Sequence, residues 1–160
     1  VYRAQQIEAR LREQAEQARV LAMAAQLAAA QIQPHFLYNA LAALQHWVQA
    51  KDDRAAPMLA ALTGFLRATL PLFNRPRLAL GDEAQAVREY LEVMRLRLGE
   101  RLRWRVELAP AAAPALLPPG VLLTLVENAL EHGVAPSLAG AEVEVAATAE
   151  AGRVTLTVRD

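Results

Sequence analysis

A chain of 160 residues is long enough for one ordinary domain, or for two small modules that share a linker. Hydrophobic residues make up 54% of it and charged residues 21%, a balance that excludes a disordered tail. The 17 basic and 17 acidic residues cancel. We therefore expect no nucleic acid partner, because contacts to phosphates need a basic excess. The absence of cysteine excludes disulfide frameworks, thiolate catalysis and zinc–thiolate sites.

Residues 1–33 carry the spacing of a coiled coil. Side chains of one stripe recur at alternating steps of four and three residues, the a and d positions of a heptad. The stripe consists of Ile7, Leu11, Gln14, Ala18, Leu21, Ala25, Ala28 and Ile32, of which only Gln14 is polar. We therefore expect a signalling helix over residues 1–33 that pairs with a second copy of itself.

The segment from Val20 to Ala50 contains no Asp, Glu, Lys or Arg. Glutamine, histidine and asparagine interrupt it so often that no run of about 18 apolar residues remains, and we exclude a membrane span there. A helix without charges is normally buried on most of its surface, so the segment favours a dimeric helical bundle. Pro34 interrupts the helix, and the apolar spacing resumes from Leu37 to Val48.

Two more helices follow before Gly99. The first comes after a turn in which Asp52 or Asp53 is a candidate N-cap. The second begins at Gly81 or Asp82, after a loop over residues 71–77. The residues expected to face inward are Leu59, Leu62, Leu66 and Leu70 in the first helix and Val87, Tyr90, Leu91, Met94 and Leu98 in the second.

After Gly99 the apolar period changes to two, which predicts a strand over residues 102–108. A loop rich in alanine and proline comes next, and Pro118-Pro119 suits the first turn of a helix that runs to about His132. Residues 143–145 and 154–158 predict a β-hairpin. Three strands and one helix make a small core, so we expect the second domain to be cut short at Asp160.

Two groups of polar residues are candidates for chemistry. His35 directly follows Pro34, and Asn39 lies one helical turn later on the same face. Neutral imidazole is nucleophilic at physiological pH, and the Asn39 carboxamide can hydrogen-bond a ring nitrogen or a group attached to it. The alternative is a structural histidine beside a helix kink.

The second group lies on the helix that ends near residue 132. Glu127 and Glu131 share one face of it, and Asn128 and His132 share another. Such groups on a helix can hold Mg²⁺ together with nucleotide phosphates, because Mg²⁺ prefers oxygen ligands and keeps several waters. The alternative is a solvated helix face that ends with Gly133 as a C-cap.

The order and spacing of three segments resemble the LytS-type sensor histidine kinases over about residues 20–160. The segments read AAQIQPHFLYNALAAL, LGDEAQAVREYLEVMRLRLGERL and LPPGVLLTLVENALEHGV. Pro-His-Phe-Leu-Tyr-Asn and Val-Glu-Asn-Ala are the most specific parts. The chain departs from the family at Leu123 and Thr124, where a Gln-Pro pair usually precedes the LVEN run.

The resemblance implies a role for each candidate residue. His35 matches the phospho-acceptor, and Asn128 matches the asparagine that binds Mg²⁺ in the ATP site. Glu127 is the acid beside it, and His132 matches the basic position of the same motif. Asp160 matches the aspartate that contacts the adenine amino group.

One position differs from other histidine kinase subfamilies, which carry an acidic residue directly after the phospho-acceptor. Here that residue is Phe36, which we interpret as a packing residue. The proton of His35 must then go elsewhere, and Glu127 is the candidate base. His46 and Trp47 are interpreted as packing residues, and the run of arginines from Arg95 to Arg105 as a solvated face.

We therefore expect a mainly α chain with a C-terminal α+β part. A coiled coil (1–33) leads into a dimeric four-helix bundle that carries the phosphotransfer histidine (34–99). A truncated ATPase α/β sandwich of the histidine kinase type follows (100–160), and this piece alone is expected to be inactive.

The resemblance implies ATP and Mg²⁺ as cofactors and autophosphorylation of His35, followed by transfer to an aspartate of a response regulator. It also implies a homodimer and an upstream sensor or transmembrane domain, so the chain is expected to be the cytoplasmic portion of an inner-membrane protein. Two alternatives stay open. One is a degenerate kinase that acts only as a dimeric scaffold, and the other is an ATPase of the same superfamily that does not phosphorylate protein.

Overall fold

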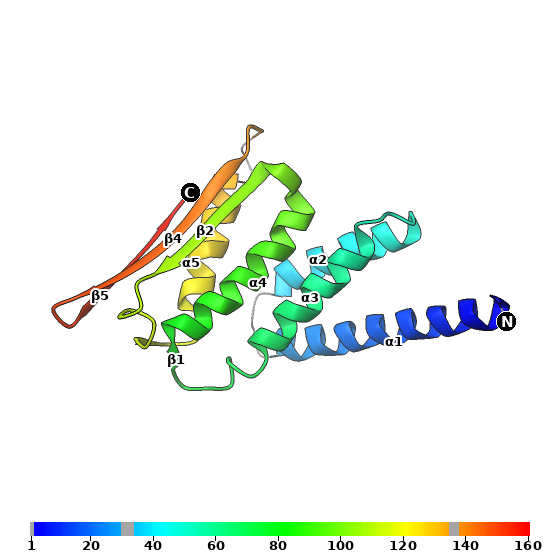
Figure 1. Cartoon of the computed structure of the whole chain (residues 1–160), viewed down its shortest axis with the longest axis horizontal. Coiled ribbons are helices and arrows are strands. Elements are labelled where there is room, and N and C mark those ends of the chain that lie inside the picture. The colour runs from blue at the N-terminus through cyan, green and yellow to red at the C-terminus, as the bar shows by residue number, and fades with distance from the viewer. Residues whose placement is uncertain (1, 30–33, 135–137) are drawn as a thin grey trace. The chain divides into compact units, whose positions relative to one another are not determined.

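The computed structural model in Figure 1 describes residues 2–29, 34–134 and 138–160. The chain divides into two compact units between Leu66 and Arg67, and each unit is described by itself. The predicted domain boundaries at residues 33 and 99 remain predictions. Within the described ranges, no helix is both long enough and apolar enough to cross a membrane.

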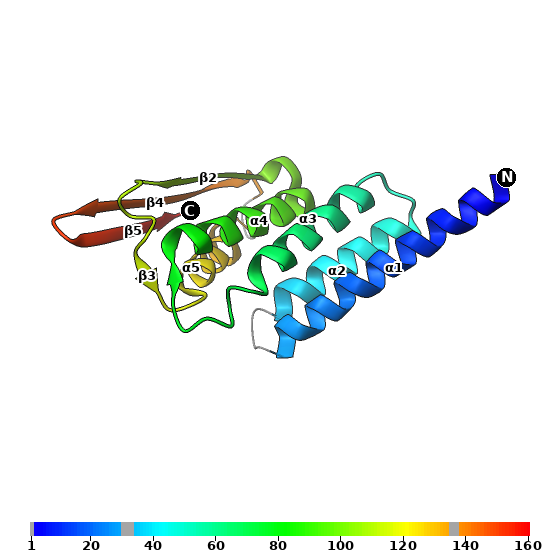
Figure 2. The same ribbon diagram turned by 60° about the horizontal axis from the view of Figure 1, so that its bottom comes forward.

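The first unit is helical. It contains α1 (Tyr2–Ala29), α2 (Pro34–Gln49) and most of α3 (Ala55–Thr69). Helices α1 and α2 lie side by side (Figure 2). The predicted interruption of the helix falls next to residues 30–33, outside the described residues, and Pro34 is the first residue of α2. That position suits proline, whose missing N–H is not needed there.

The predicted stripe of α1 stays exposed in the single chain. Ile7, Leu11 and Leu21 keep 60%, 59% and 61% of their surfaces in contact with solvent. Among residues 3–22, only Val20 is buried. The helix is confirmed over Tyr2–Ala29, and the coiled coil and the dimeric bundle stay predictions.

Helix α2 buries one face by regular spacing. The buried side chains are Phe36, Leu37, Ala40, Leu44 and Trp47 in α2, and Met58, Leu62, Phe65 and Leu66 in α3. The rings of Phe36 and Phe65 meet edge to face, with their centroids 5.2 Å apart and their planes at 80°. This geometry is one of the preferred arrangements of two aromatic rings.

The turn from α2 to α3 is held by Arg54. Its guanidinium lies 4.5 Å from the centre of the Trp47 ring and forms two-pronged hydrogen bonds with Asp52. The Asp52 carboxylate also accepts the Arg54 backbone N–H at 2.9 Å. These hydrogen bonds lower the pKa of Asp52 from 3.8 to about 2. The Asp52 carboxylate thus holds Arg54, the residue just before α3, and its predicted role as the N-cap stays a prediction.

The second unit contains a three-stranded sheet of β2 (Leu102–Leu108), β4 (Ala141–Glu150) and β5 (Arg153–Arg159) in the order β2-β4-β5. Strand β2 pairs in parallel with β4, and β4 pairs antiparallel with β5. The predicted strand and the predicted hairpin are both confirmed. Helices α4 (Leu80–Leu98) and α5 (Val121–Ala129) lie on one side of this sheet (Figure 1).

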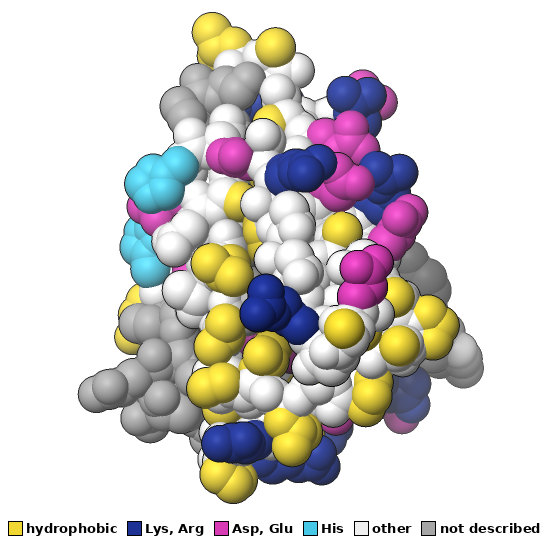
Figure 3. Space-filling view, turned by 90° about the vertical axis from the view of Figure 1, so that its left-hand side faces the viewer, with side chains coloured by type: hydrophobic (Ala, Val, Ile, Leu, Met, Phe, Trp, Pro, Cys, Tyr) yellow, Lys and Arg dark blue, Asp and Glu magenta, His cyan; other side chains and the backbone are white. Residues whose placement is uncertain are grey.

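Strand β4 alternates between buried residues and more exposed ones along its middle part. Val143, Val145 and Ala147 of β4 are buried, whereas Arg105 and Glu144 form an ion pair at the surface. Figure 3 shows basic and acidic side chains interleaved at the upper right of the face that it presents, with hydrophobic side chains gathered below them. The mixture of positive and negative charges agrees with the predicted solvated face for the arginines from Arg95 to Arg105.

A second, short strand pair was not predicted. Strand β1 (Leu78–Ala79) directly follows the predicted loop over residues 71–77. It pairs with β3 (Leu116–Leu117), which lies inside the predicted loop rich in alanine and proline. A strand of two residues is too short to show alternation of apolar and polar residues, so the sequence pattern did not predict β1 and β3.

The predicted start of α5 was wrong. The helix begins at Val121 rather than at Pro118, because Gly120 adopts a φ of +88° that ends the preceding extended segment. A left-handed residue of this kind cannot continue a right-handed helix, and glycine adopts it without a Cβ clash. After Ala129 the chain continues in a wider, π-type turn, η2 (Leu130–Val134).

Candidate functional site

His35 lies on the exposed side of α2. Its neighbours Phe36 and Leu37 are each 3% exposed and hold this end of the helix in place. Because these two side chains and Ala40 take the buried face, His35 is turned to solvent. An exposed imidazole on a well-anchored helix is accessible to a reactant.

Asn39 contacts the ring of His35, as the spacing of four residues predicts. Its amide nitrogen lies 3.3 Å from Nε2 and 3.4 Å from Nδ1. The amide donates to whichever ring nitrogen lacks a proton, so it stabilises one orientation of the neutral imidazole. The contact shows that the two residues form one group.

The aromatic neighbours of His35 have different roles. Phe36 packs on Phe65, which confirms its interpretation as a packing residue. Tyr38 is 66% exposed and does not pack in the single chain. Trp47 is buried as expected, whereas His46 is exposed.

The second group of candidates lies on α5 and the turn that follows it. Asn128 and His132 are exposed, and Glu127 is half-buried. Asn128 belongs to α5, but His132 belongs to the π-type turn. The predicted pairing of Asn128 with His132 assumed a continuous α-helix, and the wider turn changes where His132 points relative to Asn128.

Tyr90 of α4 interacts electrostatically with this group. It is 2% exposed. Burial raises its pKa, and the negative charges of Glu127 and Glu131 raise it further, against the opposite effect of Arg97. The sequence pattern identified Tyr90 only as a core residue. Its position beside the two carboxylates could not be inferred, because it depends on how α4 and α5 pack.

Asp160 lies against the end of the same turn. A Cβ atom built on Gly133 would come within 2.6 Å of the Cβ of Asp160, so only glycine fits there with Asp160 in this position. The second unit therefore brings two segments of the predicted ATP site together, the turn that carries His132 and the strand end that carries Asp160. His35 and Asn39 belong to the first unit.

One oxygen donor of this group suits Mg²⁺. The described residues contain no group of three or more His, Asp or Glu side chains that could hold a metal ion. Asn128 offers an exposed carboxamide oxygen. Mg²⁺ commonly takes one or two protein oxygens together with substrate phosphates and waters, which fits such a site.

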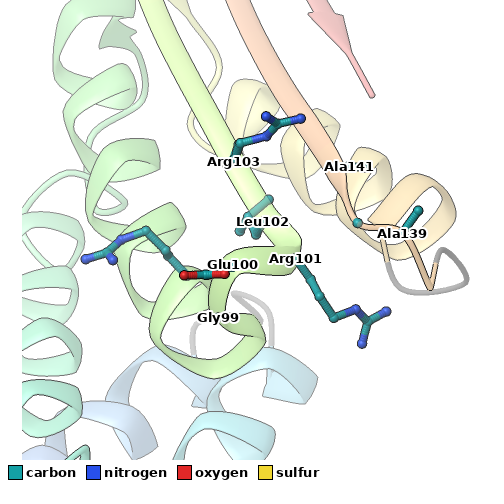
Figure 4. A pocket seen from close by; sticks show the side chains of 9 residues that line it. Gly99, Glu100, Arg101, Leu102, Arg103, Ala139 and Ala141 are labelled. Atoms are coloured by element: carbon teal, nitrogen blue, oxygen red, sulfur yellow. The ribbon is translucent and has the colours of Figure 1, made fainter.

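A separate hollow in the second unit contains none of the predicted site residues. It is lined by Arg95, Gly99, Glu100, Arg101, Leu102, Arg103, Ala139, Gly140 and Ala141. Figure 4 shows that Arg101 and Arg103 point in different directions rather than toward a common point. Arg95 is already paired with Glu92. The hollow is not built to hold an anion.

Comparison with known proteins agrees with these features. Residues 23–102 match the family described as Histidine kinase. The chain is 30% identical to Sensor protein LytS of Staphylococcus haemolyticus and 29% identical to Sensor histidine kinase YesM of Bacillus subtilis, in each case over 82% of this chain. It is 30% identical to Sensor histidine kinase YpdA of Escherichia coli over 91% of this chain.

The chain spans 22%, 23% and 26% of the lengths of these three relatives. The family match covers half of the chain and includes the whole α2 segment that presents His35. The chain belongs to the histidine kinase family and, within it, to the LytS-type sensor kinases.

Proposed function

We propose that this chain is part of a sensor histidine kinase of a two-component system, in which His35 is phosphorylated from ATP. The observation that carries the proposal is the exposed His35 ring in contact with Asn39, on a helix whose other face is buried. Phosphorylation of His35 requires this exposure, whereas a dimeric scaffold does not require it.

In the proposed reaction the unprotonated ring nitrogen of His35 is released from the Asn39 amide and attacks the γ-phosphorus of ATP. A P–N bond forms, the bond from phosphorus to the bridging oxygen breaks, and ADP leaves with that electron pair. The proton on the other ring nitrogen passes to a base, for which we propose Glu127. The phosphoryl group then moves to an aspartate carboxylate of a response regulator, which regenerates the free imidazole.

On the nucleotide side, we propose that Asn128 binds the metal, that His132 contacts the phosphates and that Asp160 recognises adenine. Mg²⁺, when bound, neutralises negative charge on the transferring phosphoryl group. The half-buried Glu127 lies close enough to Tyr90 to raise the pKa of that residue. This buried neighbour supports a carboxylate held in a defined place.

We also propose that the kinase is a homodimer through the N-terminal helices. Ile7, Leu11 and Leu21 are exposed large apolar residues on one stripe of α1, which a second copy would cover. An upstream sensor that moves α1 and a response regulator that receives the phosphoryl group are the further proposed partners. The chain would then act on the cytoplasmic side, where ATP is supplied.

The test is incorporation of acid-labile phosphate from radiolabelled ATP by the full-length protein. The kinase proposal predicts label in wild type and loss of label in Asn128→Ala, which cannot place the metal. Asn39→Ala should retain most of the label, because a neutral hydrogen bond contributes only about 0.5–1.5 kcal/mol. A wild-type protein that binds ATP and incorporates no phosphate would support the scaffold instead.

A further inference from the structure

Glu83 is a buried acid that the sequence pattern did not single out. It lies in the first turn of α4 and is 0% exposed. One carboxylate oxygen, Oε1, accepts the backbone N–H of Leu122 at 2.9 Å and that of Leu123 at 3.2 Å. Both amides belong to the first turn of α5, so Glu83 caps a helix that lies about 40 residues further along the chain.

Helix α5 has no cap of its own. Its N-cap residue is Gly120, which has no side chain, and the helix start shows no local side-chain hydrogen bond. The first amides of a helix have no partner within the helix and are costly to bury unpaired. Glu83 therefore supplies from α4 what Ser, Thr, Asp or Asn at position 120 would ordinarily supply.

This remote cap carries a cost that a local one would avoid. The second oxygen of Glu83, Oε2, is buried and has no hydrogen-bond partner among the described residues. Burial raises the pKa of Glu83, against the lowering effect of the backbone N–H groups of Leu123, Leu122 and Gly120. One of the two carboxyl oxygens of Glu83 is therefore buried without a hydrogen bond. In return, the hydrogen bonds of the other oxygen fix the position of α5 along α4.

The surrounding backbone ties the same two segments together. The N–H of Leu80 donates to the carbonyl of Ala115 at 2.7 Å, and the N–H of Gly81 donates to that of Ala113 at 2.9 Å. The first turn of α4 thus holds the segment that leads into α5. Two turns later, α4 still packs on α5, and the negative charge of Glu127 on α5 raises the pKa of Tyr90 on α4. Helix α4 therefore supports α5 both at its first turn and near Glu127.

We propose that Glu83 is a positioning residue for the nucleotide site, because it sets where α5 presents Glu127 and Asn128. The inference rests on the proposed function, in which α5 carries the groups that meet Mg²⁺ and ATP. Catalytic and ligand-binding groups must be held to within a fraction of an ångström, and a 1 Å error can cost about a hundredfold in rate. Glu83 touches neither ATP nor metal.

The test compares Glu83→Ala and Glu83→Gln with Glu89→Ala in the full-length protein. Glu89 is a matched control, because it is an acid on the same helix whose carboxylate accepts a hydrogen bond from Gln85. Calorimetry measures the affinity for MgADP, and hydrogen exchange measures protection of residues 121–129 against residues 141–159. Neither readout needs phosphoryl transfer, so both remain informative if His35 is not the acceptor.

Glu83→Ala should weaken MgADP binding about tenfold, as loss of supporting partners of a metal site does. It should also raise amide exchange in residues 121–129 while residues 141–159 stay protected. Glu83→Gln should remain within about twofold of wild type in both readouts. Its amide oxygen still accepts the two N–H groups, and burial already favours the uncharged form of the carboxyl group.

Two results would overturn the proposal. One is an Ala variant that behaves like Glu89→Ala in both measurements. The other is faster exchange in residues 121–129 with unchanged MgADP affinity, which would make Glu83 a purely structural cap. If Glu83→Ala does not fold, Glu83→Asp takes its place, because it keeps the charge and shortens the reach by one methylene. An aspartate variant with wild-type MgADP affinity would likewise overturn the positioning role.

Discussion

Replacing Phe36 by alanine tests whether the helix that presents His35 is anchored as described. Phe36 is 3% exposed and Phe65 is 1% exposed, so each ring is removed from water almost completely. Truncation of a buried phenylalanine to alanine costs about 3–5 kcal/mol, through lost burial and the cavity left behind. The edge-to-face pair with centroids 5.2 Å apart adds about 0.5–1.5 kcal/mol of coupling.

The assay is denaturant unfolding of the 160-residue chain at one fixed protein concentration, followed by circular dichroism. Phe36→Ala, Phe65→Ala and the double variant form a cycle that isolates the coupling between the two rings. Tyr38→Ala is the matched control, because this aromatic residue of the same helix is 66% exposed. Its cost should stay within about 0.5 kcal/mol.

A Phe36→Ala variant that loses no more stability than Tyr38→Ala would refute the reasoning. Additive effects of Phe36→Ala and Phe65→Ala would leave the burial intact but show that the ring contact contributes nothing of its own. In the first case the orientation of His35 would need another explanation.

Three further results are expected. Leu21→Asp should weaken the proposed dimer in sedimentation equilibrium, because the interface would then bury an unpaired carboxylate in each copy, at a cost of about 2 kcal/mol or more. Ala22→Asp, beside the stripe, should leave the dimer intact. Gly133→Ala should weaken MgADP affinity in calorimetry, because the new Cβ would occupy the place of Asp160, and unchanged affinity would contradict the proposed adenine contact. Asp52→Asn should remove a pH dependence of unfolding. The pKa of Asp52 falls from 3.8 to about 2 on folding, so its contribution is present above pH 3.8 and is lost as pH falls through 2. Equal slopes for variant and wild type over that range would contradict the ion pair with Arg54.

Regular periodicity predicted the elements that depend on it. The alternation of Leu102, Trp104 and Val106 predicted β2, and the spacing of Val87, Tyr90 and Leu91 predicted the buried face of α4. Both patterns arise because one face of the element is less exposed than the other along its length, so the signal repeats every turn or every second residue.

The features that periodicity missed depend on single residues or on packing between distant segments. Gly120 is a single left-handed residue that ends an extended segment. The Pro-Pro pair just before it is also typical of a helix start, so the sequence predicted the helix too early. Nothing in the sequence indicated that Glu83 is buried, because acidic residues are common in the exposed first turn of a helix. Its partners lie about 40 residues away, so only the fold could reveal them.

The candidate site shows the same division. The contact between His35 and Asn39 followed from helical spacing alone. The change of helix type after Ala129 did not, and it alters where His132 lies relative to Asn128. The place of Asp160 beside Gly133 joins segments that are separated by two strands and could not be predicted from spacing.

The central claim is that His35 accepts the phosphoryl group. The most direct measurement is labelling of the full-length kinase with radiolabelled ATP, comparing His35→Ala with His46→Ala, the other exposed histidine of α2. The account predicts that His35→Ala loses all acid-labile label while it still binds MgADP, and that His46→Ala keeps the wild-type rate. Labelling of His35→Ala at the wild-type rate would contradict the assignment and direct attention to His46.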